Sequence, residues 1–265
     1  MHLIDRLKSA TPLICGHRGN MLHSPENTLA SLRSAAAAGA QLCEIDVQTT
    51  SDGEFVLMHD LTLERTTNGT GFVHRTAAHQ IAGLDAGSWF GPGFAGEPVP
   101  TLRAVLDLAG ELGIGLVIEI KQRHADDAWI AGLADQIQTA GMTEAVAISS
   151  FDHPQLKRLK SVAPHLKTIG IVHHRPVDAV ALVHAAQLDG LVVDFPMFHI
   201  DDARDLRRAG VWVVYAPPRP QVFGHAARHD VAMADDLETL LGSGLIDFVV
   251  GDDVGWLVGK AAIAG

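Results

Sequence analysis

Apolar strand-like runs alternate with helical patterns along most of the 265-residue chain, and this rhythm constrains the fold more than any other feature. The main predicted strands lie at residues 12–16, 41–48, 115–120, 146–149, 168–172, 190–194, 211–215 and 246–250. Strands that alternate with helices usually form a parallel sheet that is covered on both faces. Eight such units predict an α/β protein in which the sheet closes into a (β/α)8 TIM barrel.

An open, doubly wound sheet is the main alternative architecture. Nucleotide-binding sheets of that kind carry a GxGxxG or Walker A sequence, and neither motif follows the first predicted strand. A length of 265 residues with 47% hydrophobic residues is enough for one large core, because α/β barrels reach this size as a single domain. We therefore predict one barrel domain over residues 1–265.

The regular rhythm breaks in a stretch that is rich in Gly, Thr and Pro. This stretch covers about residues 61–100 and predicts an irregular insertion after the second strand. Before that strand, Ser24 to Asn27 combine an N-cap residue, a proline and an early acid, and an alanine-rich run then continues to Ala38. This pattern predicts a helix with Glu26 and Asn27 in its first turn.

A hairpin is predicted at Asp52-Gly53, a dipeptide that favours a two-residue turn. The link between strand 41–48 and the next run, 54–58, is too short for a parallel crossover, so the second strand must return antiparallel. A two-residue turn would place Asp46 opposite His59, and alternation puts Glu44 on the same face as Asp46. One face would then hold two carboxylates and an imidazole.

Charged side chains gather where the predicted strands end, and in a barrel this is the edge that carries the active site. Such groups are costly in apolar runs unless hydrogen bonds, ion pairs or a metal satisfy them. Glu44 and Asp46 lie in the second strand, and Glu119 ends strand 115–120. Three converging carboxylates would repel one another without a cation, and oxygen ligands suit Mg²⁺ or Ca²⁺ better than zinc. We therefore predict that these acids hold one divalent metal.

Two cationic and two imidazole side chains are expected at the same edge. Arg18 follows the first strand and Lys121 follows the third, and a guanidinium beside an ammonium can hold a phosphate group. His17 and His59 could move protons on opposite sides of a scissile P–O bond.

Each of these residues also has a structural interpretation. Arg18 could balance Glu26 or Glu44, Lys121 could be the counter-ion of Glu119, and each histidine could be a hydrogen-bonded core residue. Trp89 and Phe90 are expected to pack in the core or the insertion rather than to form a platform for substrate.

The composition narrows the possible partners and location. A net charge of −11 argues against nonspecific binding to nucleic acid or anionic lipid. Two cysteines, Cys15 and Cys43, are too few for a disulfide framework, and we expect buried free thiols. No apolar run suits a signal peptide or a membrane span, so we expect a cytoplasmic protein without an integral membrane segment.

The same residues resemble the ordered motifs of the glycerophosphodiester phosphodiesterase family. The family pattern runs HRG, PENT, E-x-D, D-G turn, HD, RTT-x-G-x-G and E-x-K. The matching segments, in order, are His17 to Gly19, Pro25 to Thr28, Glu44 to Asp46, Asp52-Gly53, His59-Asp60, Arg65 to Gly71 and Glu119 to Lys121. The resemblance is strong over residues 13–122 and weaker beyond. The sequence departs from the family pattern at strand 211–215 and in the following loop, 216–231. This loop is expected to border the active site.

The resemblance implies a (β/α)8 barrel that hydrolyses a glycerophosphodiester to sn-glycerol 3-phosphate and an alcohol. It implies one divalent metal on the E-x-D and E-x-K acids, and two histidines as acid and base. We assign His17 as the base and His59 as the acid, and the reverse assignment stays open. Glycerophosphocholine and glycerophosphoethanolamine are the expected substrates. The alternatives are a lysophospholipase D-like or other phosphodiesterase, and a barrel that binds a phosphorylated ligand without cleaving it.

Overall fold

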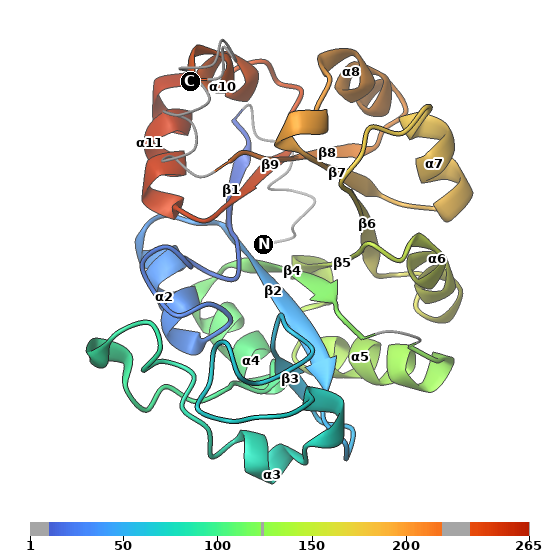
Figure 1. Ribbon diagram of the computed structural model, residues 1–265. Helices are drawn as coiled ribbons and strands as arrows, with labels where there is room; N and C mark the ends of the chain where they lie inside the picture. Colours follow the sequence, from blue (N-terminus) through green and yellow to red (C-terminus); the bar gives the residue numbers. More distant parts are fainter. Residues whose placement is uncertain (1–10, 123–124, 219–233, 265) are drawn as a thin grey trace.

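Eight parallel strands close into a barrel with helices around it in the computed structural model, which describes residues 11–122, 125–218 and 234–264 (Figure 1). The strands are β1 (Leu13–Gly16), β2 (Leu42–Thr49), β4 (Gly115–Ile120), β5 (Val146–Ser150), β6 (Lys167–Val172), β7 (Gly190–Asp194), β8 (Trp212–Ala216) and β9 (Phe248–Gly251). Pairing of β1 with both β2 and β9 closes the barrel. The predicted barrel is confirmed, and the open sheet is excluded.

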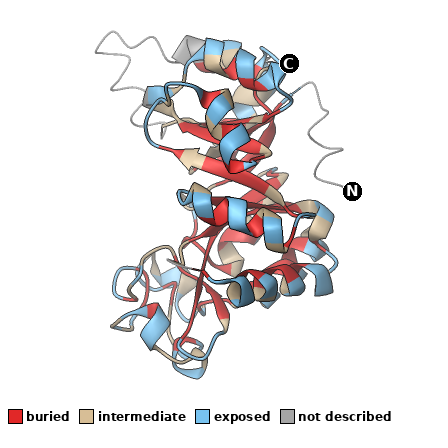
Figure 2. Ribbon diagram, turned by 90° about the vertical axis from the view of Figure 1, so that its right-hand side faces the viewer, coloured by how far each residue is buried: buried red, intermediate tan, exposed pale blue. Residues whose placement is uncertain are grey.

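Helices cover the outside of the barrel, and their buried faces pack on the strands (Figure 2). They are α2 (Leu29–Ala37), α4 (Leu102–Leu112), α5 (Asp127–Thr139), α6 (His153–Val162), α7 (Ala179–Ala186), α8 (Ile200–Arg208), α10 (Ala234–Leu241) and α11 (Val254–Ala264). Several begin at a side chain that accepts a hydrogen bond from a backbone N–H of the first turn, as Thr101 does for α4 and Asp126 for α5.

Alternation along the strands separates two apolar cores. In β2, Cys43, Ile45 and Val47 pack outward against the helices, whereas Leu42 packs inside the barrel. The inside core consists of Leu13, Cys15, Leu42, Val117, Ala147, Ile169, Val192, Val214 and Phe248. Because Glu44 follows Leu42 by two residues, it also faces the interior, toward the carboxyl ends of the strands.

The return strand of the hairpin, β3 (Phe55–Leu57), runs antiparallel to β2 as predicted, but in a different register. Val47 pairs with Leu57, and Thr49 pairs with Phe55. The predicted pairing of Asp46 with His59 is therefore wrong by one residue.

The register differs because the turn has three residues rather than two. The backbone N–H of Thr50 donates to the backbone carbonyl of Glu54, so residues 51–53 form the loop. Of these three residues, Gly53 alone has a positive φ, of 87°. The carboxylate of Asp52 accepts hydrogen bonds from Thr50 Oγ1 and from the Ala78 N–H, and these contacts hold the wider loop.

The predicted helix start at Ser24 is also wrong. Helix α2 begins after Thr28, whose Oγ1 accepts a hydrogen bond from the Ser31 N–H. Asn27 has a φ of 57°, which is left-handed and incompatible with a helical first turn. Residues 24–27 instead form a buried segment beside the strand ends.

Residues 61–100 contain three short helical turns, η1 (Val73–Arg75), α3 (Ala78–Ile81) and η2 (Pro92–Phe94), and two isolated antiparallel β-bridges. This insertion has its own small apolar cluster, which includes Leu63, Val73, Ile81 and Val99. The single-domain organisation stays a prediction.

Both cysteines are buried free thiols. Among the described helices, none is long and apolar enough to cross a membrane. Most of the loop 216–231 lies outside the described residues.

Candidate active site

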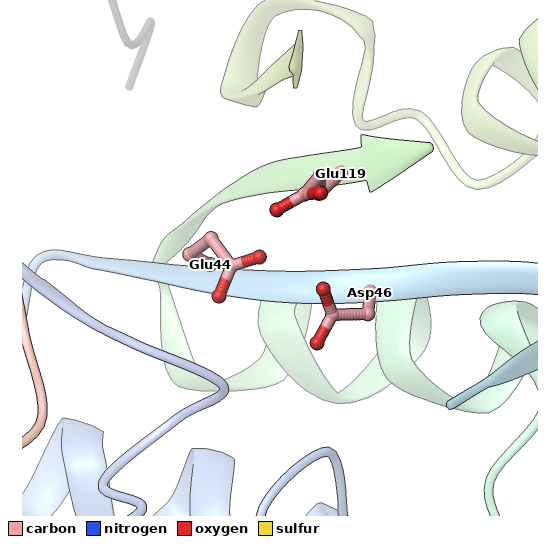
Figure 3. Close-up of side chains that lie close together, drawn as sticks. All are labelled: Glu44, Asp46 and Glu119. Carbon is pink, nitrogen blue, oxygen red and sulfur yellow. The ribbon is translucent and has the colours of Figure 1, made fainter. Parts of the chain in front are cut away.

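The three predicted metal-binding acids lie together inside the barrel. Glu44 and Asp46 come from β2 and Glu119 comes from β4, where Asp46 and Glu119 are register partners (Figure 3). One oxygen of each carboxylate lies within 4.8 Å of the other two. Each residue is at most 7% exposed. The expected convergence of these acids is confirmed.

The acid cluster fits a hard divalent cation. Glu44 Oε1 and Asp46 Oδ1 are buried and have no hydrogen-bond partner among the described residues. A buried polar atom left unsatisfied costs about 1–3 kcal/mol, and more when it is charged. Mg²⁺ and Ca²⁺ prefer carboxylate oxygens and would satisfy both atoms. The three acids could therefore hold such an ion.

Lys121 provides part of the positive charge around the cluster in this structure. Its Nζ lies 2.5 Å from Glu119 Oε1 and 3.2 Å from Asp46 Oδ1. Burial lowers the pKa of Lys121, but the charges of Asp46 and Glu119 outweigh this effect and the net shift is upward. The counter-ion interpretation of Lys121 is thus correct for this state of the site.

The acids differ in how strongly they hold a proton. Burial, followed by the charge of Asp46, raises the pKa of Glu44 to about 8. Burial also raises the pKa of Asp46, but the charges of Lys121 and Arg18 outweigh it, so that pKa is lowered. Without a cation, the cluster therefore does not carry three full negative charges at neutral pH.

Arg18 connects the acid cluster to the loop that precedes α2. Its backbone N–H donates to Glu44 Oε2 at 2.9 Å, and its Nη1 donates to Glu26 Oε1 at 2.8 Å. Its Nε lies 3.3 Å from Asp46 Oδ2. The predicted balance of Arg18 by Glu26 is therefore present, and the guanidinium also lies at the pocket wall.

The imidazole of His17 is oriented by Asp252, which follows β9. His17 Nδ1 lies 2.6 Å from Asp252 Oδ1, and Nε2 lies 3.9 Å from Glu44 Oε2. Burial lowers the pKa of His17, but the Asp252 hydrogen bond and the Glu44 charge outweigh it, so the pKa is raised.

His59 has a similar arrangement. Its Nδ1 lies 2.7 Å from Asp60 Oδ1, and Asp60 accepts two hydrogen bonds from Arg65. The Arg65 hydrogen bonds lower the pKa of Asp60 to about 2, so this carboxylate stays charged. Each histidine thus has a carboxylate at Nδ1.

Three residues of the site were missed or misread by the sequence interpretation. Asn27 donates to Asp46 Oδ2 at 2.7 Å and accepts from the Asp46 N–H at 3.0 Å, and Glu26 binds Arg18 and Arg65. The PENT motif was the available signal for Glu26 and Asn27, but we assigned both to a helix start. For Asp252 the only signal was that residues 247–253 resemble the closing element of the family, and its pairing with His17, 235 residues away, was not predicted.

A pocket of about 590 Å³ opens over the acid cluster. One wall is polar and contains His17, Arg18, Glu44, His59, Glu119 and Lys121. The rest of the lining is mainly apolar and includes Phe151, Ile171, Val192, Phe195 and Val250. Six of the seven predicted site residues therefore line one cavity, and Asp46 belongs to the same acid cluster as Glu44 and Glu119.

Comparison with known proteins gives consistent matches. Residues 17–216 match the model of the glycerophosphoryl diester phosphodiesterase family. A glycerophosphodiester phosphodiesterase of Caldanaerobacter subterraneus is 44% identical over 61% of this chain and 66% of its own length. One from Bacillus subtilis is 30% identical over 75% of this chain and 74% of its own length. The chain thus aligns with just under two thirds of the Caldanaerobacter relative.

Solved structures share the whole barrel. An Oleispira antarctica phosphodiesterase, solved in complex with the product sn-glycerol-3-phosphate, is 27% identical with a TM-score of 0.82 and covers 97% of this chain and 99% of its own. A glycerophosphodiester phosphodiesterase from Agrobacterium tumefaciens is 26% identical with a TM-score of 0.78 and covers 95% and 99%.

Proposed function

The chain belongs to the glycerophosphoryl diester phosphodiesterase family, and we propose that it hydrolyses glycerophosphodiesters to sn-glycerol 3-phosphate and an alcohol. The main support is one pocket that is lined by Glu44 and Glu119 of the acid cluster and by the two carboxylate-oriented histidines. The Oleispira phosphodiesterase, solved with sn-glycerol-3-phosphate, supports a glycerol phosphate ligand for this chain. Glycerophosphocholine and glycerophosphoethanolamine are the expected substrates.

Glu44, Asp46 and Glu119 would hold one divalent cation, Mg²⁺ or Ca²⁺. When bound, this ion supplies positive charge that stabilises the negative charge growing on the phosphate oxygens. Arg18 and Lys121 contribute further positive charge from the pocket wall.

The two histidines would move the protons. His17 takes a proton from the attacking oxygen, which belongs to the glycerol 2-hydroxyl or to water, as that oxygen bonds to phosphorus. His59 donates a proton to the departing alcohol oxygen as its P–O bond breaks. If the 2-hydroxyl attacks, a cyclic phosphate forms, and water then opens it to glycerol phosphate.

The direction of proton transfer can be tested separately. Burial lowers the pKa of His17, but the Asp252 hydrogen bond and the Glu44 charge outweigh it, so we expect the limb of the pH–rate profile due to His17 above the pKa of a free imidazole. The pH–rate profiles of variants at the two histidines would distinguish the assignments, because loss of the acid removes the high-pH limb.

The central test replaces each histidine in turn. His17→Ala and His59→Ala should each lower the rate of glycerophosphocholine hydrolysis at least about 10²-fold, the usual contribution of one acid or base. His184→Ala, at an exposed position on α7, is the matched control and should keep the wild-type rate. A near-normal rate in either site variant, with the fold intact, would reject the two-histidine scheme. Metal-dependent release of sn-glycerol 3-phosphate would exclude the barrel that only binds.

A further inference from the structure

A second pocket, of about 320 Å³, lies between the loop that follows β1 and the insertion. Its apolar side chains are Met21, Leu22, Trp89 and Phe90, and its charged side chains are Arg18, Glu26, Arg65 and Asp252. Arg18 and Asp252 also line the first pocket. The two pockets are therefore neighbours that meet at one arginine and at the carboxylate that orients His17.

The charged groups of the second pocket are already paired with protein groups. Arg65 makes two hydrogen bonds of 2.8 Å to Glu26, and Glu26 also accepts one from Arg18. Asp252 binds His17. In contrast, the apolar side chains remain accessible, and Trp89 is 41% exposed. This pocket thus offers a ligand mainly apolar surface.

The first pocket, in contrast, has polar atoms near its acids that have no hydrogen-bond partner among the described residues. Glu44 Oε1, Asp46 Oδ1 and Ser149 Oγ are buried and lack hydrogen-bond partners within the described part of the chain. Ser149 lies beside Glu119 as its register partner on β5 and lines the pocket. The cation would satisfy the two carboxylate oxygens, and the hydroxyl-rich glycerol half of a diester can bond to Ser149 Oγ, which is also costly to leave unsatisfied.

We propose that the second pocket is the subsite for the departing alcohol, and that Trp89 and Phe90 favour alcohols with an apolar chain over the choline and ethanolamine of the two expected substrates. The phosphate group then lies at Arg18, the one cationic residue among those described that lines both pockets, with the glycerol half over the acid cluster. This inference rests on the proposed glycerophosphodiester hydrolysis. It assigns a binding role to two aromatic residues that the sequence alone places in core or insertion packing.

A homologous series of substrates tests the subsite. Glycerophosphodiesters of unbranched alcohols with two to six carbons differ little in leaving-group chemistry, so kcat/KM reports on binding of the chain. In the wild-type protein, kcat/KM should rise with chain length, by up to about fourfold per buried methylene group. Trp89→Ala should flatten this dependence. Phe72→Ala, also in the insertion and equally exposed at 41% but outside both pockets, should preserve it.

Inhibition by sn-glycerol 3-phosphate, which lacks the alcohol, shows whether Trp89→Ala damages only the alcohol subsite or the whole active site. The inhibition constant should stay within about twofold in Trp89→Ala. A chain-length dependence that persists in Trp89→Ala, and disappears in Phe151→Ala of the first pocket, would overturn the proposal. An equal loss at every chain length would also overturn it. If the wild-type protein releases no glycerol phosphate from any member, the proposed function itself fails.

Discussion

At the scale of single residues, Glu44 connects the parts of the site. It accepts a hydrogen bond from the Arg18 backbone, lies near His17 and shares the acid cluster with Asp46 and Glu119. Burial and the charge of Asp46 raise its pKa to about 8, so at pH 7 the metal-free carboxyl is mostly protonated. A bound cation requires the carboxylate, and metal binding must therefore displace this proton.

We predict that binding of Mg²⁺ or Ca²⁺ releases close to one proton at pH 7 and fewer at pH 9. At pH 9, above the raised pKa, Glu44 is already ionised. Calorimetric titration in two buffers with different ionisation enthalpies measures the proton count. Glu44→Gln should bind the ion more weakly and lose the pH dependence. Equal proton release at pH 7 and pH 9 would contradict this assignment.

A second prediction concerns the orientation of His17. The Asp252 hydrogen bond raises the His17 pKa against the opposing effect of burial, so Asp252→Asn should lower that pKa. Titration of the His17 imidazole by NMR measures it directly. Asp253→Asn removes the neighbouring carboxylate, which lies beside the exposed His23, and should leave the His17 pKa unchanged. An unshifted His17 pKa in Asp252→Asn would show that the carboxylate does not stabilise the imidazolium.

The sequence allowed the acid cluster to be predicted because its geometry is local. Glu44 and Asp46 share a face through strand alternation, and Glu119 follows from the parallel neighbour. The contact between His17 and Asp252 depends instead on barrel closure, and only the structure reveals it.

At the scale of helices and strands, turns are less predictable than the elements they join. Strand β4 matches its predicted bounds, because six consecutive buried residues leave a clear apolar run. The hairpin turn differs because Asp52 bonds to Ala78 of the insertion, a contact that a local turn rule cannot include. Similarly, Asn27 leaves the helical conformation and bonds to Asp46.

Gly113 ends α4 directly before the site strand β4, with a φ of 66° and open space around an added Cβ. Gly113→Ala should therefore destabilise the fold by about 1 kcal/mol, the conformational cost of a left-handed alanine. Gly259 lies inside α11, also with open space, and Gly259→Ala should instead stabilise by about 0.5–1 kcal/mol. Denaturant unfolding compares the two. Shifts of the same sign would contradict the structural assignment of these glycines.

At the scale of the whole molecule, the barrel separates function from stability. The active-site residues lie at the carboxyl ends of the strands, whereas Asp189 lies at the amino end of β7. Asp189 bonds to Lys160 of α6 and Lys167 of β6, and it accepts the Thr168 N–H. These contacts connect successive units of the barrel away from the pocket. The alternation of strands and helices predicted closure, but not these cross-unit ion pairs.

Asp189→Asn should lower the free energy of unfolding by about 2 kcal/mol at pH 7, the scale of hydrogen bonds to a charged group. Burial raises the Asp189 pKa, but its lysine and backbone partners outweigh that effect and lower it. Because the Asp189 pKa is lower in the folded protein than in the unfolded chain, where it is about 3.9, the charged carboxylate stabilises the fold above that pH. This stabilisation is lost as the pH falls through the pKa of the folded state. The difference in free energy of unfolding between Asp189→Asn and the wild type, measured by denaturant titration, should thus shrink below about pH 4. A difference independent of pH would reject the charged contribution.

The central claim is that three barrel acids bind one divalent ion that drives cleavage of a glycerophosphodiester. Phosphorus NMR of glycerophosphocholine hydrolysis, with chelator and then with added Mg²⁺ or Ca²⁺, tests it most directly. We predict no conversion with chelator and sn-glycerol 3-phosphate as the phosphorus product once the ion is restored. Equal conversion in chelator, or phosphocholine as the product, would contradict the account.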